Sequence, residues 1–416
     1  MRLLHVTHQY WPAIGGAEKY ITNLSEELAR RGHQVSVFTS RSVDYRTWRN
    51  ELPRSEELEG VNVRRFDSLP RTGHTWRALV YGFRNYRRTK ARRYEPFIFY
   101  GNGPICPAIF PTILWEAPRY DLIHINNLHY SHALVAYAAA RLRKVPVIIT
   151  PHVHIEQKET HDVGYMRAVL RGSDAILAVS RAEKEYLIGR GWNSEVVVGG
   201  NGLQLNRFPS LERERSRNRF GLPKDEFVIL FLGRKTRYKG LEMCLKAFSA
   251  LREKRKDVTF LAVGPETDFS RSLWTEYDGL KGLVRRGQVS DEERLAALAA
   301  CDVLAVPSGG EAFGIVYLEA WAYRKPVVAA RIASVSSIVS DGRDGFLVEP
   351  GQVGQLVDRL TRLVDDPAVA KAMGQHGRAK LERRYTVERI ADVVEGTCAR
   401  VIRRHATLME GASWCA

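Results

Sequence analysis

The sequence is poor in cysteine and in long apolar runs, and both absences limit what the protein can be. The five cysteines of this 416-residue chain are scattered, with no Cys-x-x-Cys pair, which excludes a zinc ribbon or a disulfide framework as the basis of the fold. No apolar run reaches 18 residues, so we expect no membrane-spanning helix. Residues 1–7 read as a short strand rather than as part of a cleavable signal. We therefore expect a cytoplasmic protein.

Acidic residues are few relative to basic ones. The chain has 63 lysines and arginines against 47 aspartates and glutamates, a formal net charge of +16. Such an excess attracts nucleic acid, anionic lipid or acidic small molecules, but it does not specify a fold. No Gly-x-Gly-x-x-Gly follows the first apolar strand, which argues against a dinucleotide-binding domain. The length and the hydrophobic content of 44% allow two or three domains.

Residues 303–348 contain the most informative pattern of the chain. An apolar strand at 303–306 leads into a small-residue loop, then a helix-like run at 315–323, then a strand at 326–329. This order predicts a parallel crossover unit, which binds ligands at the carboxyl end of its strands. Glu311 lies in the loop and Glu319 about two helical turns later. Carboxylates suit sugar hydroxyls, although two solvated glutamates on an ordinary crossover would look the same.

Two cations follow a second strong strand, at residues 227–232. Arg234 and Lys239 are five residues apart in a loop bounded by Gly233 and Gly240. Two fixed cations at a strand end can bind a diphosphate leaving group. The same pattern would also fit an ordinary basic surface loop, so this interpretation stays open on the residues alone.

The amino-terminal half shows the same alternation of strands and helices. A strand at 3–7 leads through Gly15 and Gly16 into a helix at 17–31. Glycines at a helix start permit close approach of the backbone to a phosphate, although such a pair is often just a turn. His129 and His152 follow two further strands. Residues just past parallel strands lie at the ligand-binding edge of a sheet.

A basic segment at residues 71–93 differs from its surroundings. It holds eight arginines and lysines and no acid, and five apolar residues recur in it at helical spacing: Trp76, Leu79, Val80, Phe83 and Tyr86. These features predict a basic amphipathic helix. It could pack against the core and leave a solvated basic face, or it could contact an anionic membrane.

These motifs together resemble a known enzyme family. The stretch PSGGEAFGIVYLEAWAYRKPVVA resembles the carboxyl-domain signature of the retaining glycosyltransferases of family 4, which have the GT-B fold. Gly233-Arg234, four further residues and Lys239-Gly240 match a second motif of that family, and Gly15-Gly16-Ala17-Glu18 resembles its first loop. The histidine in Ile149-Thr150-Pro151-His152 resembles the family's strand-end histidine.

The resemblance implies a role for each matching residue. Four residues are expected to take part in catalysis: His152, Arg234, Lys239 and Glu311. Donor binding is expected to involve Gly16, Arg234, Lys239, Glu311, Ala312, Phe313, Gly314, Ile315 and Glu319. Acceptor binding is expected to involve Gly15, Gly16 and His129. One position departs from the family, because Ser337 stands where a glutamate is common.

The resemblance extends over about residues 1–404 and implies an α/β protein of the GT-B class, with two Rossmann-like domains facing a central cleft. We expect an acceptor-binding domain at 1–207, a charged linker at 208–224 and a nucleotide-sugar-binding domain at 225–389. The helix from residue 390 to the end at residue 416 is expected to pack back on the first domain.

The expected function is that of a retaining hexosyltransferase. It would move a sugar from a UDP- or GDP-sugar to a hydroxyl of a glycan or lipid-linked acceptor, a precursor of cell-envelope polysaccharide. No Asp-x-Asp lies near the candidate loops, so we expect no metal and no cofactor. We expect no nucleic-acid partner, and peripheral association with the inner face of the plasma membrane. Two alternatives remain: a basic membrane-surface or nucleic-acid-binding protein without transferase activity, and a sugar-nucleotide epimerase on the same fold.

Overall fold

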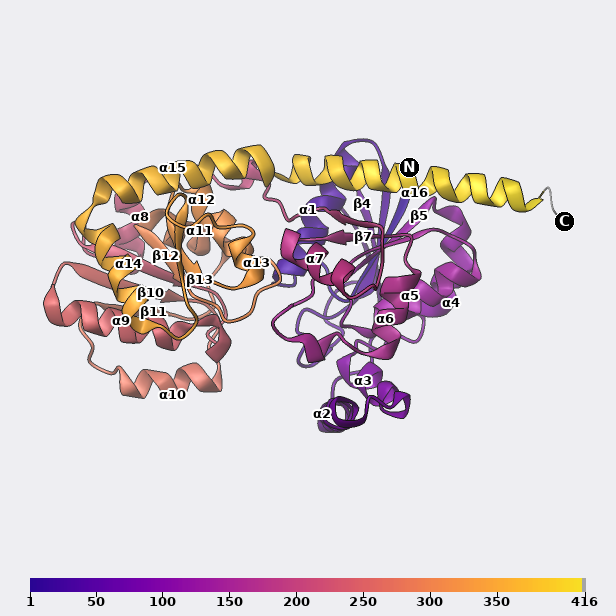
Figure 1. Cartoon of the computed structure of the whole chain (residues 1–416), viewed down its shortest axis with the longest axis horizontal. Coiled ribbons are helices and arrows are strands. Elements are labelled where there is room, and N and C mark those ends of the chain that lie inside the picture. The colour runs from indigo at the N-terminus through magenta and orange to yellow at the C-terminus, as the bar shows by residue number, and fades with distance from the viewer. Residues whose placement is uncertain (414–416) are drawn as a thin grey trace. The chain divides into compact units, whose positions relative to one another are not determined.

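The protein consists of two compact units, each of them an α/β sandwich. The computed structural model describes residues 1–413. The first unit contains residues 1–202 and the last helix, α16 (Val387–Ser413), while the second unit is Leu203–Thr386. Each unit has a sheet with helices packed around it (Figure 1). None of the helices in residues 1–413 combines the length and apolarity needed to cross a bilayer.

The first unit is built on an eight-stranded sheet in the order β3-β4-β2-β1-β5-β6-β7-β8. All neighbouring strands are parallel except β3 and β4. The strands are β1 (Arg2–Thr7), β2 (Gln34–Ser40), β3 (Ser55–Leu58), β4 (Val61–Phe66), β5 (Leu122–Asn126), β6 (Val147–Thr150), β7 (Ala175–Ala178) and β8 (Val196–Val198). The helices are α1 (Gly16–Arg30), α2 (Gly73–Thr89), α3 (Glu95–Asn102), α4 (Ile109–Glu116), α5 (Ser131–Leu142), α6 (Gly164–Gly172), α7 (Arg181–Gly189) and α16.

The second unit is built on a six-stranded, all-parallel sheet in the order β11-β10-β9-β12-β13-β14. The strands are β9 (Phe227–Leu232), β10 (Val258–Val263), β11 (Leu283–Arg286), β12 (Val303–Val306), β13 (Val327–Ala330) and β14 (Gly345–Val348). The helices are α8 (Arg213–Phe220), α9 (Leu241–Lys254), α10 (Asp268–Glu276), α11 (Asp291–Ala300), α12 (Ile315–Ala322), α13 (Ala333–Ser336), α14 (Val353–Asp365) and α15 (Pro367–Arg384).

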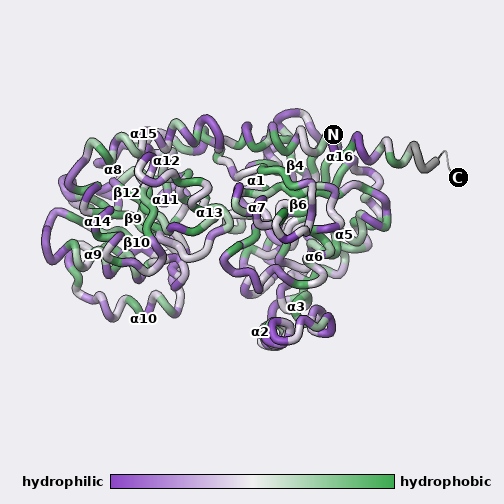
Figure 2. Tube along the Cα trace, in the orientation of Figure 1, coloured by the Kyte–Doolittle hydropathy of each residue, from purple (hydrophilic) through white to green (hydrophobic). Residues whose placement is uncertain are grey.

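The central strands are apolar because both faces of each sheet are covered. In β10 and β12 every residue is buried, as expected for parallel strands covered by helices on both sides. Figure 2 shows that hydrophobic residues gather on the strands of each unit, while the outer turns of many helices are hydrophilic. At the start of α11, Ser290 and Glu293 form a capping box, and the helix begins at Asp291.

Both sheets have a point where the strand order reverses. In the first unit, β2 to β4 lie on one side of β1 and β5 to β8 lie on the other, so the reversal lies between β1 and β5. In the second unit it lies between β9 and β12. Ligands of open α/β sheets bind outside the carboxyl ends of the strands at such a point. The loops that follow β1, β5, β9 and β12 are therefore where each unit is expected to bind its ligand.

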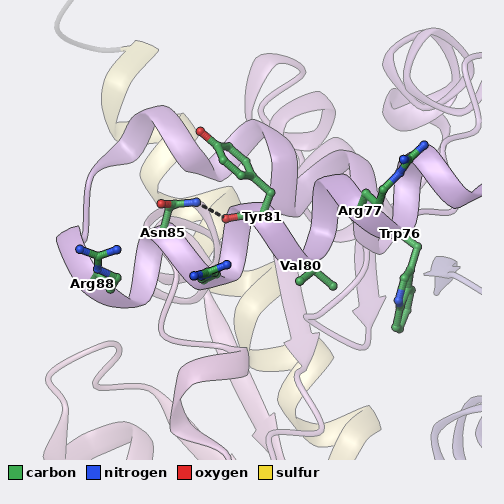
Figure 3. Close-up of a pocket in the computed structure, with 7 residues that line it drawn as sticks. Trp76, Arg77, Val80, Tyr81, Asn85 and Arg88 are labelled. Carbon is green, nitrogen blue, oxygen red and sulfur yellow. Dashed lines mark hydrogen bonds between the residues drawn. The ribbon is translucent and has the colours of Figure 1, made fainter.

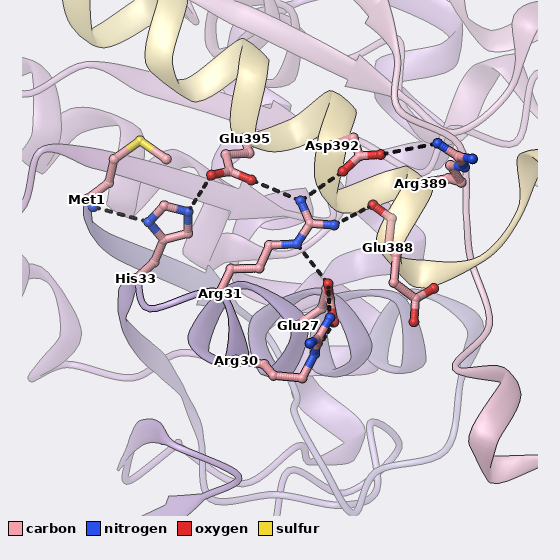
Figure 4. A network of polar contacts seen from close by, with 9 residues as sticks. All are labelled: Met1, Glu27, Arg30, Arg31, His33, Glu388, Arg389, Asp392 and Glu395. Carbon is pink, nitrogen blue, oxygen red and sulfur yellow. Dashed lines mark hydrogen bonds and ion pairs between the residues drawn. The ribbon is translucent and has the colours of Figure 1, made fainter.

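The last helix is fixed to the first unit by a network of charged groups. Arg31, at the end of α1, contacts Glu27 on α1 and Asp392 and Glu395 on α16, at 2.7 to 2.9 Å. His33 also contacts Glu395 at 2.9 Å, and Figure 4 shows this network. One guanidinium group thus joins the first helix of the chain to the last one within the same unit.

The segment expected to be a linker is partly helical. Residues 208–224 contain α8, which belongs to the second unit. Arg217 on α8 is buried, pairs with Asp302 at 2.6 Å and donates to the carbonyl oxygens of Pro223 and Lys224. A buried arginine satisfied in this way anchors a helix that has almost no apolar residues. The charged composition of the segment concealed this anchor.

Candidate functional site

The site in the second unit starts from two loops that interlock at the reversal point of its sheet. The loop after β9 includes a short 3-10 turn, η5 (Arg237–Lys239), and the loop after β12 begins at Pro307. The Gly309 amide donates to the Tyr238 carbonyl at 2.7 Å. Gly240 has a φ of 82°, and a Cβ there would lie 2.5 Å from the Pro307 carbonyl oxygen. Only glycine allows this close approach, which brings residues far apart in sequence together.

Lys239 and Glu311 meet across these two loops. Lys239 Nζ lies 2.5 Å from Glu311 Oε1, and the glutamate is buried. Burial would lower the pKa of Lys239, but the charge and hydrogen bond of Glu311, together with Tyr238, outweigh it and raise that pKa, against a smaller opposing effect of Arg234. Lys239 therefore stays protonated. Arg234 lies close enough to act on the same ammonium group, so the structure brings together three of the predicted residues.

The start of α12 follows directly after Glu311. Gly314 precedes the helix in the left-handed conformation, with a φ of 89°, and a Cβ there would clash with the Tyr317 ring. No side chain caps this helix start. Phe313 is buried against Tyr385, with ring centroids 5.7 Å apart, while Ala312 and Ile315 are half-buried. An uncapped helix start with a glycine before it offers backbone amides to an anion.

Glu319 lies on α12 and is buried beside Arg294 from α11. The two side chains are 2.9 Å apart, and Arg294 also contacts Asp291 at 2.9 Å. Burial works against the charge of Arg294, but Glu319 and Asp291 raise its pKa above the usual value. A carboxylate has several lone pairs, so Glu319 can accept further hydrogen bonds besides its contact with Arg294. Arg294 was missed by the sequence analysis, because a single arginine on a charged helix carries no signal.

Ser337, at the position that departs from the family pattern, forms a hydrogen bond within its own short helical segment. It follows the short helix α13, and its hydroxyl donates to the Ser334 carbonyl at 2.6 Å. The hydroxyl thus satisfies the end of its own helix.

In the first unit, the loop after β1 is organised by a buried ion pair. His8 Nε2 lies 2.7 Å from Glu18 Oε1, and the His8 ring stacks on Tyr130 with centroids 3.9 Å apart. Burial tends to raise the pKa of Glu18, but the hydrogen bond and charge of His8 bring it below the usual value. A Cβ on Gly15 would lie 2.0 Å from the Glu18 carboxylate, whereas Gly16 has open space. A larger residue at position 15 would therefore clash with the Glu18 side chain, whereas the space beside Gly16 leaves room for a ligand.

Asn126, the last residue of β5, connects His152 to the rest of this site. Its Nδ2 donates to Thr7 Oγ1 at 3.1 Å and to the Ala17 carbonyl at 3.2 Å, so its Oδ1 accepts from His152 Nε2 at 2.8 Å. His152 thus carries its proton on Nε2. Its backbone is in the left-handed region, with a φ of 53°, which is uncommon for a residue other than glycine and frequent at functional sites.

Several buried histidines of this unit are neutral at pH 7. Burial lowers the pKa of His132 and His152 to about 3 and that of His129 well below the usual value. His129 is half-buried, and its Nδ1 lies 3.2 Å from Asn127 Oδ1.

Three residues of this site were not selected from the sequence: His8, Glu18 and Asn126. Each of them follows or ends a central strand or lies in the first turn of the first helix. Among the described residues, no three His, Cys, Asp or Glu side chains converge as a metal site requires.

The family comparisons cover both units. The description "Glycosyl transferase 4-like domain" matches residues 15–202, and "Glycosyl transferases group 1" matches residues 212–380. A D-inositol 3-phosphate glycosyltransferase of Kineococcus radiotolerans is 30% identical over 86% of this chain and 85% of its own length. One of the same description from Nocardiopsis dassonvillei is 29% identical over 92% of this chain and 90% of its own length.

Solved structures share the fold. Anabaena HepE in complex with UDP-glucose aligns with a TM-score of 0.73 at 20% identity, covering 96% of this chain and all of that one. A sucrose-phosphate synthase of Thermosynechococcus elongatus aligns with a TM-score of 0.73 at 21% identity, over 97% of this chain and all of its own. With two Rossmann-like units matched by both family descriptions, this chain belongs to the group 1 glycosyltransferases, that is, family 4, and has the GT-B fold.

Proposed function

We propose that the protein transfers a hexose from a UDP- or GDP-sugar to an acceptor hydroxyl, with retention of the anomeric configuration and without a metal ion. The observation that carries this proposal is the Lys239–Glu311 pair beside Arg234 at the reversal point of the second sheet. It supplies fixed positive charge for a diphosphate and a carboxylate for sugar hydroxyls in one place. Known structures with this fold include complexes with UDP and UDP-glucose.

Lys239 and Arg234 would hold the diphosphate. The negative charge on the leaving phosphate oxygen grows as the bond to the anomeric carbon breaks, and fixed cations stabilise that state more than the ground state. The backbone amides at Gly314 and Ile315, at the start of α12, would add to this. Glu311 would accept hydrogen bonds from the transferred sugar, and Glu319 from the ribose of the nucleotide.

In the transfer step the acceptor hydroxyl attacks the anomeric carbon on the face from which the diphosphate leaves. The carbon–oxygen bond to the phosphate breaks, and the leaving phosphate oxygen takes the proton of the hydroxyl. The products are a glycoside and a nucleoside diphosphate. Because burial keeps His152 neutral, it would act as a hydrogen-bonding partner of the transferred sugar, oriented by Asn126.

The acceptor would bind in the first unit, at Gly15, Gly16 and His129. The relatives named above are D-inositol 3-phosphate glycosyltransferases, which supports an acceptor that carries a phosphate. The net charge of +16 also favours an anionic acceptor. We propose a lipid-linked sugar phosphate, a precursor of cell-envelope polysaccharide, used at the inner face of the plasma membrane.

The test is turnover with UDP- and GDP-sugars in the presence of EDTA. We expect one donor class to be used, and the anomeric configuration of the product to match that of the donor by NMR. Supplying inositol phosphate and a lipid-linked sugar phosphate in parallel distinguishes the two acceptor classes. Activity that EDTA abolishes and manganese restores would contradict the metal-free mechanism. Release of an altered free sugar without an acceptor would indicate an epimerase.

A further inference from the structure

Helix α2 has an outer face that none of the described residues of its unit covers. Its inner side, with Leu79, Phe83 and Tyr86, packs into the core of the first unit. Trp76 and Val80, predicted to belong to the same apolar stripe, instead lie on the outside, 54% and 52% exposed. The single stripe expected from the sequence is thus divided between two faces, because residues at the edge of a helical stripe can turn away from the core.

The outer face of α2 is a shallow hollow that mixes arginine with aromatic and apolar side chains. Its lining residues are Trp76, Arg77, Val80, Tyr81, Arg84, Asn85 and Arg88. At 3.6 residues per turn the arginines lie between Trp76 and Val80 on one side and Tyr81 on the other. Figure 3 shows Trp76 and Val80 projecting from one edge of the helix and Tyr81 from the other.

The exposed aromatic surface continues onto α3. Phe97 and Tyr100 of α3 are also exposed, and the Tyr81 and Phe97 rings lie edge to face with centroids 5.1 Å apart. The two helices pack closely, since a Cβ on Gly82 or on Gly101 would meet the opposite helix within 3 Å. The exposed aromatic side chains are therefore presented by a rigid pair of helices.

The arginines of this face have no acidic partner among residues 1–413, although Arg77 lies 3.1 Å from His74 Nδ1. Within the described residues, Arg77, Arg84 and Arg88 form no ion pair with an acidic side chain, whereas neighbouring Arg87 lies 3.4 Å from Glu159. Arginines without an acidic partner, flanked by tryptophan and tyrosine, are typical of a helix that lies in the headgroup region of a bilayer. The guanidinium groups contact lipid phosphates there, and the aromatic rings enter the interface.

We infer that the outer face of α2, together with Phe97 and Tyr100 of α3, docks the protein on an anionic lipid bilayer. The docking surface would bring a lipid-linked acceptor to the first unit, and this role alone rests on the proposed function. Mixed aromatic and basic side chains on one rigid helix pair favour a bilayer over a duplex nucleic acid, which is bound mainly through positive charge.

The test is co-sedimentation of the full chain with vesicles of phosphatidylglycerol and phosphatidylcholine, and with vesicles of phosphatidylcholine alone. We expect binding to the anionic vesicles that weakens with salt. The variant Arg77→Gln/Arg84→Gln/Arg88→Gln should lose about fivefold in affinity for each arginine that faces the lipid, roughly 100-fold in total. Trp76→Ala should weaken binding in low and high salt alike, since it removes apolar contact.

The matched control removes the same charge elsewhere. Arg215, Arg383 and Arg384 are exposed residues of the second unit, and changing them to glutamine should leave vesicle binding within about twofold. Far-UV circular dichroism checks that each variant is folded. The docking proposal is overturned if the wild-type chain does not sediment with anionic vesicles at low salt, if the control weakens binding equally, or if duplex DNA competes fully for the same face.

Sedimentation requires neither donor nor acceptor, so its outcome is separate from that of the proposed function. A protein that docks but transfers no sugar would contradict the transferase mechanism alone. One that transfers sugar to soluble acceptors but does not dock would contradict the docking surface alone.

Discussion

The two units have the same strand order around their reversal points, yet they place opposite kinds of polar groups there. In the first unit the groups are mainly neutral: His152 and His132 are buried and bonded to Asn126. In the second unit they are charged and paired, as in Lys239–Glu311 and Arg294–Glu319. A shared topology therefore sets where a ligand binds, and the side chains at the strand ends set which chemistry it meets.

The difference follows from how each group tolerates burial. An isolated imidazole loses its proton when it is removed from water, whereas a lysine or arginine keeps its charge if a carboxylate is within hydrogen-bonding distance. Of the 12 histidines, only His376 belongs to the second unit. The charged pairs of the second unit fit the proposed binding of a diphosphate there, and the neutral groups of the first unit fit the proposed contact of His152 with the transferred sugar.

The largest effect is expected when the paired charges of the second unit are broken. Lys239→Ala removes a cation from the proposed diphosphate site and leaves Glu311 buried without its partner. We expect turnover to fall by about 10²–10³-fold. Arg237→Ala is the control, since Arg237 lies two residues away but is mostly exposed, and it should retain most of the activity. Near-normal turnover of Lys239→Ala would remove the lysine from the mechanism.

Glu319→Gln is expected to weaken donor binding rather than slow the chemical step. The change removes a charged hydrogen-bond acceptor for the ribose and the partner of Arg294, a loss of about 1.5–3 kcal/mol. Titration calorimetry with the donor's nucleoside diphosphate measures it. Glu292→Gln on the exposed side of α11 serves as the control. Unchanged affinity would show that Glu319 only supports the packing of α11 and α12.

In the first unit, Asn126 offers a test of the neutral histidine. Asn126→Leu removes the acceptor of His152 Nε2–H and should lower turnover by about tenfold. Asn126→Asp keeps an acceptor but places a carboxylate beside the imidazole, which should raise the pKa of His152. We expect the pH–rate profile of Asn126→Asp to shift on its acidic side. An unshifted profile with normal turnover would mean that the protonation state of His152 is irrelevant.

Much of this arrangement could be predicted from the sequence, because its signals are local. The alternation of apolar strands and helices predicted two α/β units. The strand ends were indicated by the loop glycines and by Arg234, Lys239, Glu311 and Glu319. What local patterns could not give was the pairing: Lys239 meets Glu311 across 72 positions. Such contacts depend on the order of the strands in the sheet, and the spacing of residues along the chain does not reveal that order.

The same reason explains where the sequence-based prediction differs from the structure. Arg217 makes α8 part of the second unit by bonding to Asp302, which is 85 positions away, so charge alone made residues 208–224 look like a linker. On α2, helical spacing grouped Trp76 with Leu79, although only the packing of α3 decides which of the two is covered. Asn126 was not selected from the sequence, because its side-chain partners Thr7, Ala17 and His152 are distant along the chain.

The last prediction concerns acid, which should separate the two units. Burial lowers the pKa of His5, His132 and His152 to about 3, against about 6.5 in an unfolded chain. Below about pH 6.5 the unfolded state binds more protons than the folded state, so the free energy of unfolding falls as the pH decreases. Each of these histidines should destabilise the first unit by about 1.4 kcal/mol per pH unit between roughly pH 6 and pH 3. The second unit has only His376, which is exposed. Hydrogen exchange at pH 7 and pH 5.5, corrected for intrinsic rates, should therefore show protection lost first from β1, β5 and β6. Equal loss in β9 and β12 would contradict the assignment of neutral histidines to one unit.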